Sequence, residues 1–140
     1  MSVIDKRKIG FEEIEIPQKY GHQFWKVYFI VTNGDSEVTQ YFDKLQTSIQ
    51  KIVKDLIALM ASYNGYYKSE RIDWRLKKYN YGELRQFPHR FFFFISCGKN
   101  LIFFKCILKK KEDIPDIVYN RINKKKEVYE QAFRQFIKTH

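Results

Sequence analysis

Cationic side chains stand close together in two short stretches of this sequence, and their types suit a phosphate-bearing ligand. They are Arg85, His89, Arg90, Lys109, Lys110 and Lys111. Arginine grips a phosphate through two parallel hydrogen bonds, and lysine adds a point charge. Histidine, with an ordinary pKa of about 6.5, can transfer a proton at neutral pH. This combination therefore predicts a site that binds phosphate and stabilises negative charge.

A predicted β-hairpin brings the two stretches together. The sequence "PHRFFFFISCGKNLIFFKCILKKK" contains two apolar runs separated by a glycine-containing turn, which is typical of a hairpin. Facing residues of such antiparallel strands have numbers that sum to about 198 here, so Arg90 is expected opposite residue 108. If "GELRQF" pairs with "RFFFFI", Arg85 lies at the same end of the sheet.

Each of these residues also has a simpler interpretation. Strand ends are solvated and attract lysine and arginine, and for Lys109–Lys111 alone that explanation is favoured. A single histidine such as His89 is often a turn or surface residue. The motifs of phosphate-binding loops, dinucleotide folds, zinc proteases and serine hydrolases are absent, and the carboxylates are scattered. We therefore expect chemistry without a metal or cofactor.

The positive charge is concentrated in one part of the chain. Residues 1–67 have 8 basic and 8 acidic side chains, residues 68–111 have 12 and 3, and residues 112–140 have 6 and 5. The middle block thus holds nearly all of the net charge of +10, and it includes Arg75, Lys77 and Lys105. Such a local positive field favours a polyanionic partner, although general solubility charge is the alternative.

The elements that position these residues predict an α+β fold. Period-two and helical spacing of the apolar residues indicate strands at 23–31, 71–79, 82–87, 90–97 and 100–110, and helices at 36–46, 47–62 and from Pro115 onward. We expect one domain, residues 1–140, with an antiparallel sheet of about four strands. A helical hairpin and the C-terminal helix would pack on one face of this sheet. Residues 1–20 are either a loose arm or an edge strand ending at Pro17.

No membrane contact is expected, and the predicted location is the cytoplasm. The longest apolar runs have about six residues, whereas a spanning helix needs about 20. The first residues lack the apolar core of a secretory signal. Cys97 and Cys106 fall out of register in the hairpin, which argues against a disulfide.

Three stretches in one order resemble the RelE/ParE toxin superfamily, most closely its HigB-like branch. They are "VYFIVTNGDSEVTQYFDKL", "GELRQFPHRFFFFI" and "NLIFFKCILKKKEDIPDIVYNRI". The family pattern has a strand and "NG" turn before a short helix, then an "ELR" segment, then a last strand ending in lysines before a proline and a helix. The resemblance covers roughly residues 25–130 and implies a RelE-like fold.

The resemblance implies the toxin of a type II toxin–antitoxin pair. Such toxins bind the ribosome and cut mRNA without metal, as the RNA 2′-hydroxyl attacks the adjacent phosphate. It implies that Arg90 stabilises that phosphate with Lys109 and Lys110, and that His89 is a candidate for proton transfer. The implied RNA contacts are Arg85, Lys105, Lys111, Arg75, Lys77 and Tyr119. The implied partners are the ribosome, mRNA and an antitoxin, expected to be a helix-turn-helix protein.

Two alternatives remain open at this point. One is a gyrase poison of the ParE type, which acts through protein contacts. The other is a member of the superfamily that binds RNA or protein without cutting. A stacking platform like that of an RNA-recognition motif is not predicted, because the phenylalanine run lacks the accompanying pattern and fits a core better.

Overall fold

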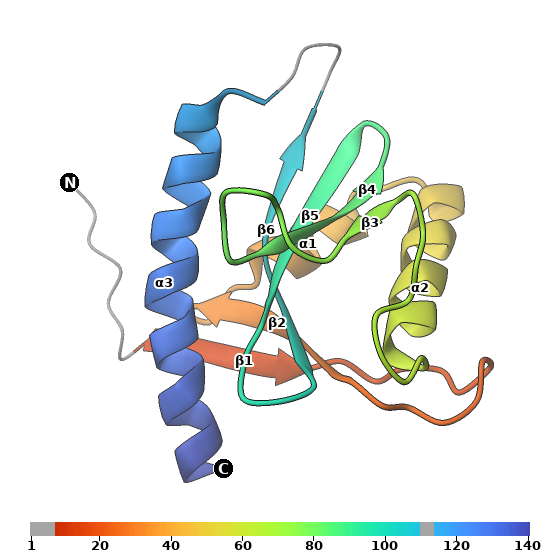
Figure 1. The fold of residues 1–140 in the computed structure, drawn as a ribbon, viewed down its shortest axis with the longest axis horizontal. Helices are drawn as coiled ribbons and strands as arrows, with labels where there is room; N and C mark the ends of the chain where they lie inside the picture. Colours follow the sequence, from red (N-terminus) through yellow and green to blue (C-terminus); the bar gives the residue numbers. More distant parts are fainter. Residues whose placement is uncertain (1–7, 110–113) are drawn as a thin grey trace.

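The computed structural model describes residues 8–109 and 114–140 of the chain. Its elements are β1 (Ile9–Glu13), β2 (Lys26–Thr32), α1 (Glu37–Asp43), α2 (Thr47–Ala61), β3 (Ile72–Asp73), β4 (Gly82–Gln86), β5 (His89–Ile95), β6 (Asn100–Leu108) and α3 (Asp116–Thr139). Figure 1 shows them around one central sheet. The predicted α+β class and all three predicted helices are confirmed.

The sheet differs from the predicted antiparallel sheet of about four strands. It has six strands in the order β1-β2-β6-β5-β4-β3, and β2 runs parallel to β6. The four-stranded antiparallel prediction is therefore wrong. Because the two helices and three strands separate β2 from β6, no tight turn dictates their relative direction. The two edge strands, β1 and β3, are short, and β3 covers only two of the residues predicted at 71–79.

The hairpin of β5 and β6 has nearly the predicted register. His89 lies opposite Leu108 and Arg90 opposite Ile107, one residue from the predicted partner. A bulge beside Phe92 and Phe93 then shifts the pairing. The Pro88–Arg90 end of the hairpin does lie beside the end of β6.

Helices cover both faces of the sheet. Successive side chains of β5 point in opposite directions. Phe91 contacts Tyr41 of α1 at 5.7 Å between ring centroids, and Phe92 contacts Tyr119 of α3 at 6.1 Å. The one-face prediction is therefore wrong: a central strand that is apolar on both sides needs cover on both. Figure 1 shows α3 and α2 on opposite sides of the sheet.

The N-terminal edge strand lies earlier than the sequence indicated. β1 ends at Glu13, whereas the predicted strand ended at Pro17. The pairing with β2 and the contact of Phe11 with Phe133 and Phe136 of α3 fix it there. This segment is thus part of the sheet.

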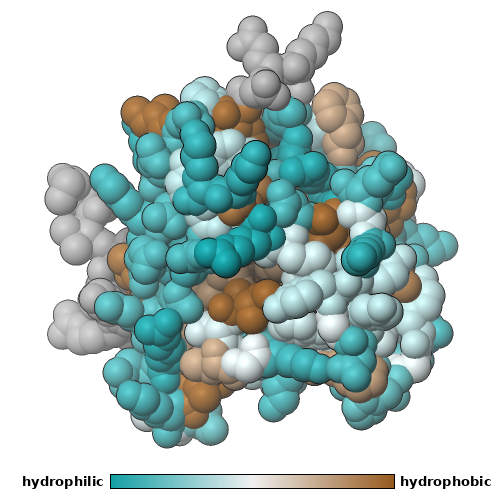
Figure 2. All heavy atoms as spheres, viewed as in Figure 1, coloured by the Kyte–Doolittle hydropathy of each residue, from teal (hydrophilic) through white to brown (hydrophobic). Residues whose placement is uncertain are grey.

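The described helices and the surface were compared with what a membrane-spanning segment requires. No helix in residues 8–109 or 114–140 has both the length and the apolar character to cross a bilayer. Figure 2 shows mainly hydrophilic residues on one face, with smaller hydrophobic patches between them.

Candidate functional site

Arg85 and Arg90 form the centre of the candidate site. They are direct cross-strand partners in β4 and β5, so their side chains share the face that α3 covers. Both contact Glu83: Arg85 Nη2 lies 3.0 Å from Oε1, and Arg90 Nη1 lies 3.1 Å from Oε2. The Glu83 side chain is only 1% exposed, and that of Arg90 is 13% exposed. The sequence prediction that the two arginines lie together holds in the structure.

A second carboxylate lies near Arg85. Asp73 of β3 lies 3.6 Å from Arg85 Nη2. Asp73 and Glu83 are two of the three acidic residues in the basic block, residues 68–111. The four side chains therefore sum to zero charge. Arg85 is 40% exposed and is the more accessible of the two arginines. Sequence reasoning missed both acids. Glu83 and Arg85 stand two residues apart in one predicted strand and so share a face, which is a usable signal for their contact.

His89 does not join the arginines. It follows Pro88 and precedes Arg90 in an extended strand, so its side chain points to the opposite face. Its Nδ1 lies 2.7 Å from the hydroxyl of Tyr41, a residue that sequence reasoning missed.

Burial keeps the His89–Tyr41 pair uncharged at neutral pH. It lowers the pKa of His89 below its ordinary value and raises the pKa of Tyr41 to about 12. A neutral His89 with its proton on Nε2 accepts a hydrogen bond from the Tyr41 hydroxyl at Nδ1. The pair therefore joins α1 to β5 through a hydrogen bond rather than an ion pair.

Lys105 lies opposite Phe92 in β6 but is already paired. Its ammonium is 2.7 Å from Glu37 of α1. Lys125 of α3 is close enough that Lys105 lowers its pKa, although burial is the larger cause of that lowering. Sequence reasoning did not single out Lys125, because helix residues gave no spacing signal for this contact.

The lysines at the end of β6 are only partly placed. The backbone N–H of Lys109 donates to the carbonyl of Pro88 at 2.6 Å. This bond holds the end of β6 next to the start of β5, as the hairpin register predicted. Lys110 and Lys111 lie outside the described residues. Their predicted roles stay predictions.

Tyr119 and Lys77 line one shallow hollow near the start of α3. Its volume is about 170 Å³, and Tyr79 contributes to it as well. The rings of Tyr79 and Tyr119 stack at 5.9 Å with an angle of 19° between their planes. Tyr81 donates its hydroxyl proton to the carbonyl of Tyr119, which ties α3 to the start of β4.

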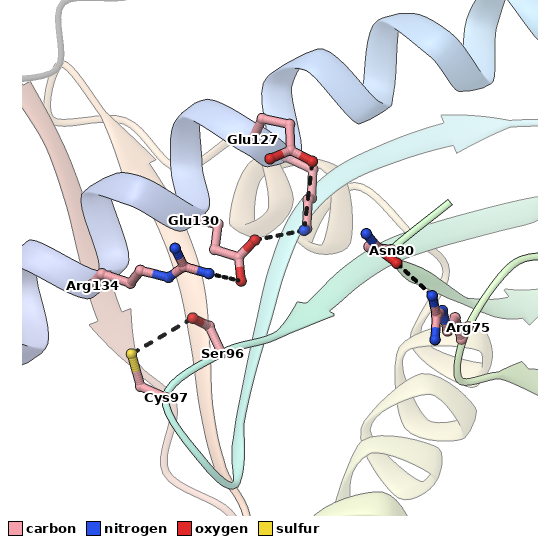
Figure 3. A network of polar contacts seen from close by, with 8 residues as sticks. Arg75, Asn80, Ser96, Cys97, Glu127, Glu130 and Arg134 are labelled. Carbon is pink, nitrogen blue, oxygen red and sulfur yellow. Dashed lines mark hydrogen bonds and ion pairs between the residues drawn. The ribbon is translucent and has the colours of Figure 1, made fainter. Parts of the chain in front are cut away.

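Arg75 is linked to the arginine pair through Asp73. The Arg75 backbone N–H donates to Asp73 Oδ1 at 3.2 Å, and its guanidinium donates to Asn80 Oδ1 at 2.8 Å. Figure 3 shows this bond; the ion pair of Glu130 with Arg134 on α3 is drawn separately in the same view. Arg75 is exposed, so its charge is accessible to a ligand.

Neither a metal nor a known relative defines this site. Within residues 8–109 and 114–140, no group of three or more His, Cys, Asp and Glu side chains is placed to hold a metal ion. No family model matches the chain, and no curated protein matches it significantly. The function therefore has to be argued from the residues themselves.

Proposed function

We propose that this chain is a toxin of the RelE/ParE type that cuts mRNA on the ribosome. The observation that carries the proposal is the cross-strand pair of Arg85 and Arg90, held on one face of the sheet. The basic block around it gives the attraction for RNA, because nearly all of the chain's excess positive charge lies there. The proposed partner in the cell is an antitoxin that covers the exposed Arg85 side of this pair.

The proposed reaction needs charge stabilisation at one phosphate. The RNA 2′-hydroxyl attacks the adjacent phosphorus and loses its proton, the bond to the 5′-oxygen breaks, and that oxygen gains a proton. Arg90 would stabilise the negative charge that develops on the phosphate oxygens, and Arg85 would orient the strand. His89 lies on the opposite face, so the proposal gives it no part in the proton transfers.

One observation favours a second candidate, an RNA-binding protein without nuclease activity. Both arginines already contact Glu83, and Arg85 also lies near Asp73. A guanidinium shared with a carboxylate stabilises a new negative charge less than a free one does. In this candidate the chain would hold RNA without cutting it.

A cleavage assay in a bacterial translation extract tests the proposal. We expect the wild-type chain to cut translated mRNA and leave 2′,3′-cyclic phosphate ends. Arg90→Lys keeps the charge that Glu83 needs but loses the two-pronged grip, so cleavage should fall about 10²–10³-fold. Arg134→Lys on α3, where the arginine is exposed, is the matched control and should cut like wild type.

Other outcomes would replace the proposal. Intact mRNA together with RNA binding would support the non-enzymatic candidate. Growth arrest with whole mRNA and accumulating gyrase–DNA breaks would identify a gyrase poison. Circular dichroism of each purified variant checks that a loss of activity is not a loss of fold.

A further inference from the structure

A second hollow lies beside the β3–β4 edge, apart from the Arg85–Arg90 pair. Its volume is about 400 Å³, within the range of small-molecule sites. It is lined by Tyr66, Trp74, Arg75, Asn80, Tyr81 and Ile95. Aromatic rings and two polar side chains thus converge on one space.

The aromatic side of the hollow is held in place by hydrogen bonds. Trp74 Nε1 donates to the carbonyl of Tyr67 at 2.8 Å, and Trp25 Nε1 donates to that of Gly65 at 3.1 Å. The ring of Tyr66 packs against both indoles, at centroid distances of 5.1 Å from Trp74 and 5.9 Å from Trp25. Tyr66 is nevertheless 59% exposed. It therefore offers a fixed aromatic surface to solvent, which reduces the entropy lost on binding.

The polar side of the hollow has hydrogen-bonding capacity for a ligand. Arg75 donates to Asn80 Oδ1, and this contact orients both side chains (Figure 3). A guanidinium has five N–H donors and a primary amide has two, so one bond uses only part of what they offer. Groups of this kind hydrogen-bond base edges and phosphate oxygens.

The chain around the hollow interleaves aromatic and cationic residues. Residues 65–81 contain Tyr66, Tyr67, Trp74, Tyr79 and Tyr81 together with Lys68, Arg71, Arg75, Lys77 and Lys78. Proteins that bind single-stranded nucleic acid combine stacking rings with a positive backbone track in this way. A duplex is a poor fit, because its bases are already stacked and paired.

We propose that this hollow binds an unpaired base of single-stranded RNA, which stacks on Tyr66 beside Arg75 and Asn80. The site goes beyond the proposed nuclease function, since binding here needs neither the ribosome nor cleavage. It gives the chain a second point of contact with RNA along the β3–β4 edge.

Fluorescence anisotropy with the full-length chain tests this site. The probe is a fluorescein-labelled single-stranded RNA of about ten nucleotides, a length within known site sizes. Tyr66→Ala should weaken binding about tenfold or more, and Tyr66→Phe should keep wild-type affinity because the ring remains. Tyr63→Ala, which removes another half-exposed tyrosine of the same loop from outside the hollow, is the control and should bind like wild type.

Several results would overturn the proposal. Unchanged affinity of Tyr66→Ala would do so, as would a Phe variant as weak as the Ala variant. Equal affinity for the duplex of the same sequence, or no binding of the single strand, would also reject the site. Because no ribosome is present, a failure of mRNA cleavage in the translation extract leaves these outcomes unaffected.

Discussion

Glu83 lies in a nearly inaccessible position between two arginines. Arg85 donates to it from Nε at 3.2 Å and from Nη2 at 3.0 Å, whereas the Arg90 contact is an ion pair that lacks hydrogen-bond alignment. A buried ion pair stabilises little by itself, but removing one partner leaves the other charge uncompensated. The arginine geometry therefore depends on Glu83.

Replacing Glu83 by glutamine should strongly destabilise the fold. The side chain keeps its shape but loses its charge, and Arg90, whose side chain is only 13% exposed, is left without its counter-ion. We expect the free energy of unfolding to fall by about 3–5 kcal/mol. Urea denaturation followed by circular dichroism measures this change.

Asp73→Asn is the matched control for that experiment. It also removes one carboxylate from the network, but this side chain is 36% exposed and lies farther from Arg85. We expect a loss of about 0–1 kcal/mol. Equal losses in the two variants would show that burial of Glu83 does not set the stability of the pair.

His89 and Arg90 show which part of the site was within reach of the sequence. Proximity along the chain and the hairpin register placed both residues at one end of the sheet, and this was right. Strand alternation separates them onto opposite faces, and that consequence follows from the sequence as well. Tyr41, the partner of His89, and Glu37, the partner of Lys105, both come from α1. No local sequence pattern predicts which strand residue a helix side chain contacts.

Gly82 lets the short strand β3 approach β4 closely. A Cβ at this position would meet the carbonyl oxygen of Asp73, and it would lie 2.6 Å from that of Trp74 and 2.7 Å from Phe93 Cζ. Backbone atoms cannot give way as the end of a flexible side chain can. The position thus couples the sheet edge to both the arginine network and the aromatic hollow.

Gly82→Ala should therefore disturb this edge. We expect a loss of about 1–3 kcal/mol in the free energy of unfolding, and weaker RNA binding as Trp74 shifts. Thermal denaturation and anisotropy measure the two effects.

Gly10→Ala in β1 is the matched control, because its Cβ would have only an ordinary contact at 3.9 Å with Val31. It should be close to neutral in both assays. A neutral Gly82→Ala variant would mean that β3 moves away without cost.

Elements with a local signal were predicted, and the pairing of strands that lie far apart in the sequence was not. The amphipathic spacing in α1, α2 and α3 and the turn between β5 and β6 lie within short windows. The parallel contact of β2 with β6 joins segments about 70 residues apart. The burial of both sheet faces was visible in the apolar run of β5, but not which helix covers each face.

At the scale of the whole molecule, the location of charge matters more than its total. The net charge is +10, but residues 1–67 balance and residues 68–111 do not. Exposed lysines are present in both parts, among them Lys44 and Lys51 in the first and Lys68 and Lys77 in the second. If RNA lies along the basic block, only the second pair should meet its phosphates.

Two double variants with the same change in net charge distinguish RNA binding along residues 68–111 from a response to the overall net charge. For Lys68→Gln with Lys77→Gln, we expect the slope of log K against log salt concentration to become shallower by about 0.7 per lost phosphate contact. Lys44→Gln with Lys51→Gln should leave the slope unchanged. Anisotropy titrations of the single-stranded RNA across a salt series give both slopes. Equal changes in the two double variants would mean that RNA responds only to the overall charge and follows no track along residues 68–111.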